Sequence, residues 1–274
     1  MTPAARRLVT SLAVTSLLLT SPRAMPAMRS GGGLELGVTY TLAYNTTVLL
    51  SELRQAAPGG VKDVGYQILA DAECSVIWQH PEDDGQQLIM LTVSSPQLLV
   101  RSRRAPQPDG FAAHGSLLEA APAQPLLVLT GGPAGAPPRL WRHPQLDEQT
   151  ANLARGLVGL LRLRAEGQYR ETDASGACDV TYRWDGPLTL VKTKERCEAA
   201  APVHTASHRV LDVSVTSVRE TRFAFSAGGG SRLESSSSEE RHQLTPAVRG
   251  GYGTEVAALQ ALQVTGCRLY LPAQ

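Results

Sequence analysis

The sequence predicts a mainly β protein in which an antiparallel β-barrel closes around one central α-helix. Three observations lead to this prediction: long segments alternate between apolar and polar residues, one segment has helical spacing, and turn-forming residues are abundant. The 274 residues include 25 glycines and 18 prolines, and only 5% are aromatic. This composition favours many short strands joined by turns over a bundle of helices.

The first 27 residues have the pattern of a secretory signal peptide. Arg6 and Arg7 precede an apolar run over residues 8–19, and cleavage is expected at Ala24 or Ala27. The run is shorter than the roughly 20 residues that cross a bilayer, and no later segment could cross one. A buried amphipathic helix is the alternative. The signal peptide predicts a protein of the endoplasmic reticulum lumen or secretory pathway, where disulfides persist.

Alternating residues predict the strands of the first half. In residues 34–50, apolar and polar side chains alternate, so that one face of the strand is apolar and the other polar. Residues 64–78 repeat this pattern. A third strand is expected at residues 87–93, and the proline-rich segment 96–125 is expected to be a loop. Shorter strands follow near residues 126–130 and 139–142. Alternation of this length indicates strands with one buried face.

One segment, at about residues 147–164, has helical spacing instead. Four leucines recur three or four positions apart, which gives the helix one apolar face. These are Leu153, Leu157, Leu160 and Leu161. Asp147, Glu148 and Thr150 supply the acids and the cap that favour a helix N-terminus. We expect the apolar face to fill the barrel as the core of a central helix.

The second half returns to alternation, with strands expected at 178–184, 188–194, 210–218 and 222–226. Residues 227–240 begin as a glycine-rich loop, and their acidic serine part could form an exposed edge strand. A last, weak apolar stretch covers residues 256–262. About ten antiparallel strands must close or stack to protect their edges, and a barrel around the helix fits best.

Two of the four cysteines flank a predicted hairpin turn at residues 185–187. Cys178 and Cys197 are therefore expected near each other, and a disulfide is the first interpretation. By closing the loop between these cysteines, it would stabilise the fold by roughly 3 kcal/mol in the chain-entropy treatment. A metal site is the alternative, which the absence of a C-x-x-C motif or a nearby histidine disfavours. Cys74 is expected in the core and Cys267 in the tail, with pairing of these two left open.

Two short motifs point to modification. Asn45-Thr46-Thr47 is an N-glycosylation sequon. Arg101-Ser102-Arg103-Arg104 matches a proprotein-convertase pattern, with a solvated basic loop as the alternative. Both motifs are short, so each predicts a possible modification rather than an established one.

Charge and motifs exclude several function classes. With 26 basic and 25 acidic residues, the net charge is +1, so the chain lacks the basic footprint of a nucleic-acid-binding protein. It also lacks a G-x-S-x-G elbow, an H-E-x-x-H motif and a glycine-rich phosphate loop. We therefore expect no catalytic residues, no cofactor and no bound metal, and the chain is not expected to be an enzyme.

Several segments together resemble the N-terminal, vitellogenin-type domain of the large lipid transfer proteins. This family includes vitellogenin, apolipoprotein B and the microsomal triglyceride transfer protein large subunits. In the helix, Asn152 and the Arg155-Gly156-Leu157 run are similar to the family's central helix. The other resembling segments, in order, are residues 40–50, 64–68, 76–81, 82–85, 87–89 and 175–182 with Cys197 downstream.

The resemblance implies a barrel around a central helix, with Cys178 and Cys197 as the family's disulfide hairpin. Because Arg155 lies near the apolar helix face, we expect it to make a buried ion pair or contacts to carbonyl groups. The implied partners are apolipoprotein B for this barrel, neutral lipid in the full-length protein, and protein disulfide isomerase through further domains. Residues 28–264 form the expected barrel domain and residues 265–274 an unassigned tail; the family's α-helical and lipid-cavity domains are absent from the sequence.

Two functions follow from this resemblance. The first is a lipid transporter of the endoplasmic reticulum lumen, which transfers triglyceride to nascent apolipoprotein B and is represented here by its partner-binding barrel. The second is a stand-alone binding module of the secretory pathway, which contacts apolipoprotein B without transferring lipid.

Overall fold

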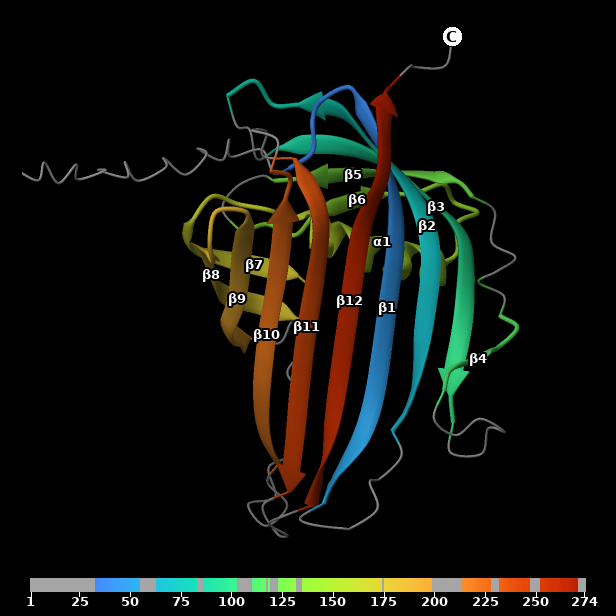
Figure 1. Ribbon diagram of the computed structural model, residues 1–274, viewed down its shortest axis with the longest axis vertical. Helices are drawn as coiled ribbons and strands as arrows, with labels where there is room; N and C mark the ends of the chain where they lie inside the picture. The colour runs from blue at the N-terminus through green and yellow to red at the C-terminus, as the bar shows by residue number, and fades with distance from the viewer. Residues whose placement is uncertain are drawn as a thin grey trace, which may run out of the picture.

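A computed structural model shows one 12-stranded antiparallel sheet curving around the helix α1 (Figure 1). The structure describes residues 33–54, 63–82, 86–102, 110–116, 118, 123–131, 135–173, 175–198, 213–227, 232–246 and 252–270. The helix α1 covers Glu148–Leu161. The strands are β1 Val38–Arg54, β2 Val64–Gln79, β3 Gln87–Arg101, β4 Ala112–Ala113, β5 Pro125–Thr130, β6 Arg139–Trp141, β7 Gly167–Asp173, β8 Gly176–Trp184, β9 Thr189–Glu198, β10 Val213–Phe225, β11 Leu233–Pro246 and β12 Tyr252–Leu269.

The strand order brings the first and last strands together. It runs β6-β5-β3-β2-β1-β12-β11-β10-β9-β8-β7, with β4 added beside β3. Along β1 and β12 the pairing extends from Val38↔Leu269 to Arg54↔Tyr252. The segment 265–269, expected to be part of a tail, therefore forms the end of a central strand.

The core lies between the concave face of the sheet and α1. Alternate residues of β1, Tyr40, Leu42 and Tyr44, are buried on this face and meet apolar side chains from the other strands and from α1. The helix begins at Glu148, as the sequence indicates. Asp147 caps it, since its carboxylate accepts a hydrogen bond from the Thr150 amide at 2.7 Å. Leu153, Leu157, Leu160 and Leu161 are all buried.

The predicted barrel closure is not found, because the sheet is open. Its end strands, β6 and β7, are not paired with each other within the described residues. Pro137 and Pro138 precede β6 and Pro144 follows it, and proline has no amide hydrogen for a ladder. Since β6 has only three residues, it offers little backbone for pairing with β7. We call the gap between β6 and β7 the seam.

The proline-rich segment contains more strand than the sequence suggested. β3 continues past Pro96 to Arg101 instead of ending near residue 93. The register with β2 shifts between Leu69↔Gln97 and Asp71↔Ser94, so Ser95 and Pro96 lie in a bulge. Ser95 has a φ of 50° there. A bulge tolerates proline because no ladder hydrogen bond is required of it.

The serine-rich segment is likewise not an edge strand. β11 lies between β10 and β12 in the interior of the sheet, and Ser236 is buried. β10 is one continuous strand rather than two, and β7 has no counterpart among the predicted strands. Small side chains at an inner position let α1 lie close over β11 and β12 (Figure 1).

Candidate functional site

The concave face around α1 is the candidate site, because α1 leaves two grooves open beside it. The helix approaches the sheet closely at Gly156, where an added Cβ would lie 2.8 Å from the Tyr44 hydroxyl. Gln260 Nε2 donates to that hydroxyl at 3.2 Å. Glycine at this helix position therefore allows the close approach.

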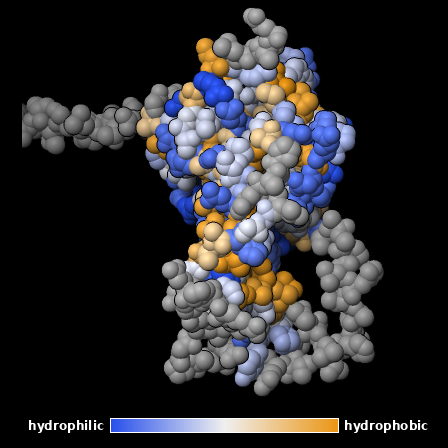
Figure 2. Space-filling view, turned by 90° about the vertical axis from the view of Figure 1, so that its right-hand side faces the viewer, coloured by the Kyte–Doolittle hydropathy of each residue, from blue (hydrophilic) through white to orange (hydrophobic). Residues whose placement is uncertain are grey.

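The two grooves lie on either side of this contact. The α1–β2 groove holds about 950 Å³ and is lined by side chains of β1–β3, including Ile68 and Leu98. The α1–β6 groove holds about 580 Å³ and is lined by α1, β5, β6 and the polar side chains of β9 and β11. In the side view of Figure 2, further apolar residues gather on the lower part of the molecule. Volumes of this size suit small ligands or single side chains of a partner.

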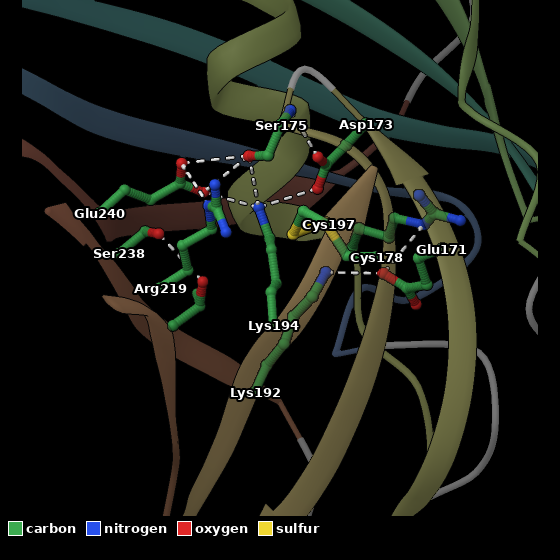
Figure 3. A network of polar contacts seen from close by, with 12 residues as sticks. Glu171, Asp173, Ser175, Cys178, Lys192, Lys194, Cys197, Arg219, Ser238 and Glu240 are labelled. Atoms are coloured by element: carbon green, nitrogen blue, oxygen red, sulfur yellow. Dashed lines mark hydrogen bonds and ion pairs between the residues drawn. A yellow bond between two sulfur atoms is a disulfide. The ribbon is translucent and has the colours of Figure 1, made fainter. Parts of the chain in front are cut away.

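A buried ionic cluster occupies the β7–β9 side of the concave face (Figure 3). Glu171 on β7 is 1% exposed, and Lys192 Nζ on β9 donates to its Oε2 at 2.7 Å. Arg164 Nε lies 3.1 Å from Oε1, Arg162 Nε lies 3.9 Å from Oε2, and the Tyr182 hydroxyl donates to Oε1 at 3.1 Å. Burial alone would raise the pKa of Glu171, but the neighbouring cations outweigh it and hold that pKa below its ordinary value.

A second branch of the cluster links β7, β9 and β11. Lys194 Nζ donates to Glu240 Oε1 at 2.7 Å and lies 2.9 Å from Asp173 Oδ2. Ser175 Oγ lies 3.1 Å from both oxygens of Glu240. Burial would raise the pKa of Asp173, yet Lys194 more than offsets this and the pKa lies below its ordinary value. Asp173 is therefore charged at neutral pH, as is Lys194, whose pKa the two neighbouring carboxylates raise despite its burial.

These shifts predict acid sensitivity. Since the folded-state pKa values of Glu171 and Asp173 lie below the ordinary 4.5 and 3.8, the folded state binds fewer protons than the unfolded state. Their stabilising contribution is present above about pH 5 and is lost as the pH falls through these values. We expect urea midpoints to be level from pH 5 to 7 and to fall towards pH 3. The same urea midpoint at pH 3.5 and pH 6 would contradict this prediction. In the Glu171→Gln variant, the urea midpoint should fall less steeply with decreasing pH than in the wild type.

The seam between β6 and β7 is held by a backbone hydrogen bond and an arginine. The Thr172 amide donates to the Gly135 carbonyl at 2.9 Å. Arg162 Nη1 donates to the Thr172 carbonyl at 3.1 Å, and its Nη2 donates to the Ala136 carbonyl at 3.0 Å. One side chain thus bonds both sides of the seam while its Nε faces Glu171.

The prediction that Arg155 makes a buried ion pair is wrong. The Arg155 side chain is 50% exposed and donates to Glu148 Oε1 at 2.7 Å on the outer side of α1. Arg162 takes the expected role instead, because the helix ends there with an extended residue and the side chain turns into the seam. Arg155 and Arg162 are seven residues apart, which is about two helical turns, so helical spacing alone could not distinguish them.

We expect Arg155→Ala to leave the free energy of unfolding almost unchanged, since exposed pairs contribute little. Arg162→Ala should lower it by about 2 kcal/mol, because two partly buried carbonyl groups lose a charged donor. Urea denaturation of both variants at pH 7 tests this. The interpretation fails if the two variants unfold at the same urea concentration.

The predicted disulfide between Cys178 and Cys197 is confirmed. Cys178 on β8 and Cys197 on β9 form a disulfide with Cα atoms 4.0 Å apart. Cys74 is buried and Cys267 is exposed, and neither is in a disulfide. Burial raises the pKa of the Cys74 thiol to about 12, so this thiol stays protonated and unreactive.

The modification motifs remain predictions. Asn45 lies within β1, and its side-chain oxygen accepts a hydrogen bond from Gln67 Nε2 at 3.1 Å. The predicted signal peptide lies outside the described residues, as do Arg103 and Arg104 of the basic motif. Within the described ranges, no α-helix has the length and apolar character needed to cross a bilayer. No group of three or more potential metal ligands occurs in the part of the chain that the structure describes.

Comparison with known proteins gives sequence relatives and a shared fold. No family model matches the chain. It is 29% identical over 262 residues to a microsomal triglyceride transfer protein large subunit from Danio rerio, which covers 92% of this chain and 28% of the relative. The corresponding subunit from Bos taurus is 28% identical over 194 residues, covering 67% of this chain and 21% of the relative. The chain therefore spans less than a third of these relatives' length.

Part of a larger protein of known structure shares this fold. A solved structure of lipovitellin superposes with a TM-score of 0.62 at 18% identity, over 88% of this chain and 26% of that one. At this identity the likeness concerns the fold. The chain thus resembles microsomal triglyceride transfer protein large subunits in sequence and lipovitellin in fold, which confirms the resemblance that the sequence indicated.

Proposed function

We propose that this chain is the partner-binding N-terminal part of a lipid transporter of the endoplasmic reticulum lumen, which transfers triglyceride to nascent apolipoprotein B. The observation that carries the proposal is the similarity over 92% of the chain to relatives named for triglyceride transfer. The predicted signal peptide and the disulfide between Cys178 and Cys197 support a luminal location.

The filled concave face supports a contact role for this part. α1 and its buried leucines occupy the space that a bulky neutral lipid would need, and the two remaining grooves, of about 950 and 580 Å³, have the size of sites for small ligands. Under this proposal the sheet binds apolipoprotein B. Neutral lipid and protein disulfide isomerase would be bound by further domains of a longer protein.

A second candidate is a stand-alone module that binds apolipoprotein B without transferring lipid. It is favoured by the same filled concave face, which suits a contact surface better than a lipid carrier. Neither candidate assigns a catalytic role to the chain.

The size of the endogenous protein distinguishes the two candidates. An antibody raised against residues 33–270 should detect a band several times larger than 29.2 kDa if the chain is the first part of a transporter. A band at 29.2 kDa less the signal peptide would favour the stand-alone module.

Binding tests the feature that both candidates share. The purified chain, immobilised, should bind the N-terminal segment of apolipoprotein B saturably and should not bind serum albumin. Absence of saturable binding would contradict both. Transfer of labelled triolein between vesicles by the purified chain alone would contradict the stand-alone module.

A further inference from the structure

The α1–β6 groove has two chemically different parts. Its apolar wall comes from β5, β6 and the helix, with Val128, Leu140 and Val158 among the lining residues. Its opposite end is formed by Lys194, Glu240 and other charged residues of the ionic cluster. One groove of about 580 Å³ therefore offers an apolar channel that ends at charged groups.

The ionic cluster to which the charged end belongs has more cations than anions. Its contacts join five basic side chains to three carboxylates, which leaves a net charge of +2. The basic residues are Arg162, Arg164, Lys192, Lys194 and Arg219, and the acids are Glu171, Asp173 and Glu240. His242 Nε2, 3.8 Å from Glu240, adds further positive charge whenever it is protonated. Excess charge at buried positions is costly unless a counter-ion balances it.

Arg219 shows where such a counter-ion would be held. Its side chain is 16% exposed, and its Nε lies 4.0 Å from Glu240 Oε2, beyond hydrogen-bond distance. This Nε is buried and has no hydrogen-bond partner among the described residues. In Figure 3 its guanidinium group points towards Glu240 and Ser175, both of which line the groove. A buried donor without an acceptor, beside excess positive charge, suits an anion.

We propose that the α1–β6 groove binds an anionic amphiphile with a single acyl chain. Its carboxylate or phosphate group accepts a hydrogen bond from Arg219, and its chain lies along Val128, Leu140 and Val158. Lys194 contributes charge alone, because its three donors already face Glu240, Asp173 and Ser175. Charge complementarity selects the head group, and the apolar wall selects a molecule with a chain over a free inorganic anion. This site is independent of apolipoprotein binding and is expected under either candidate function.

Calorimetric titration with matched probes tests the two halves of the ligand. Decanoate below its micelle concentration carries both halves, decanol carries the chain alone, and inorganic phosphate carries a charge alone. We expect saturable one-to-one binding of decanoate that is at least tenfold tighter than binding of decanol or phosphate. Absence of saturable decanoate binding would overturn the proposal. Phosphate binding as tightly as decanoate would also overturn it, because the groove would then be an inorganic anion site.

Two variants test the placement, each with a matched control. Gly159 lines the groove, and an added Cβ there meets no atom within 4 Å. Gly159→Leu should fill this space and abolish decanoate binding, whereas Gly159→Ala adds one methyl group and should retain it. Arg219→Gln should weaken decanoate binding at least tenfold without changing that of decanol. Arg222→Gln, at an exposed position of the same strand, is its control.

Circular dichroism melting of each variant confirms that it is folded before titration. If Arg219→Gln fails to fold, the Gly159 pair alone decides the result. Decanoate binding that is unchanged by Gly159→Leu would place the ligand outside the groove and overturn the proposal.

Discussion

Glu171→Ala should lower the free energy of unfolding by about 3–5 kcal/mol, the range for removing one partner of a buried ionic cluster. Glu171 is 1% exposed and faces Lys192, Arg162 and Arg164. Without the carboxylate, these cations repel one another in a region where water cannot solvate them. Urea denaturation at pH 7, followed by tryptophan fluorescence, measures the loss.

Two variants control for this result. Glu171→Gln keeps the shape and one hydrogen-bond acceptor, so it should lose less stability than the alanine variant while removing the same charge. Glu198→Ala on β9 removes a carboxylate that is 77% exposed and paired with Arg170, and it should unfold like the wild type. The importance of the cluster would be refuted if Glu171→Ala and Glu198→Ala unfolded at the same urea concentration.

Gly135→Ala should also be strongly destabilising, by at least about 3 kcal/mol. Gly135 has a φ of +88°, in the left-handed region that other L-residues adopt at a cost. An added Cβ would lie 2.1 Å from the Arg170 carbonyl oxygen of β7, so the two sides of the seam would have to separate. That separation breaks the hydrogen bond between the Thr172 amide and the Gly135 carbonyl.

Gly186→Ala separates the two causes. Gly186 has a φ of +90°, but an added Cβ there meets no atom within 4 Å. It should therefore show only the backbone cost, about 1–2 kcal/mol. Equal losses for the two alanine variants would mean that the close approach at the seam contributes nothing.

Local pattern was enough to predict the parts of the fold that depend on neighbouring residues. The alternation in residues 34–50 and 64–78 locates β1 and β2, and the leucine spacing locates α1 with its cap at Asp147. The hairpin turn at residues 185–187 likewise predicts the proximity of Cys178 and Cys197. Each of these features is encoded within about twenty residues.

The features that depend on distant partners could not be predicted in this way. β11 is polar in sequence, and its inner position comes from its pairing with β10 and β12. The ionic cluster joins Glu171, Lys192 and Glu240 from three strands, and no spacing in the sequence relates them. Closure of the barrel was predicted from the need to protect edges, but the prolines around β6 leave a seam that Arg162 bridges.

The position of β12 has a consequence for how the protein folds as it is synthesised. β12 pairs with β1 on one side and with β11 on the other, so among the described strands it alone joins β6-β5-β3-β2-β1 to β11-β10-β9-β8-β7. The hydrogen bond between Gln260 and Tyr44 spans 216 residues. Until the ribosome has released residue 269, both halves expose a long unpaired strand edge, and contacts of such separation form slowly. We therefore expect the nascent chain to expose unpaired strand edges for longer than a protein whose sheet grows from one end.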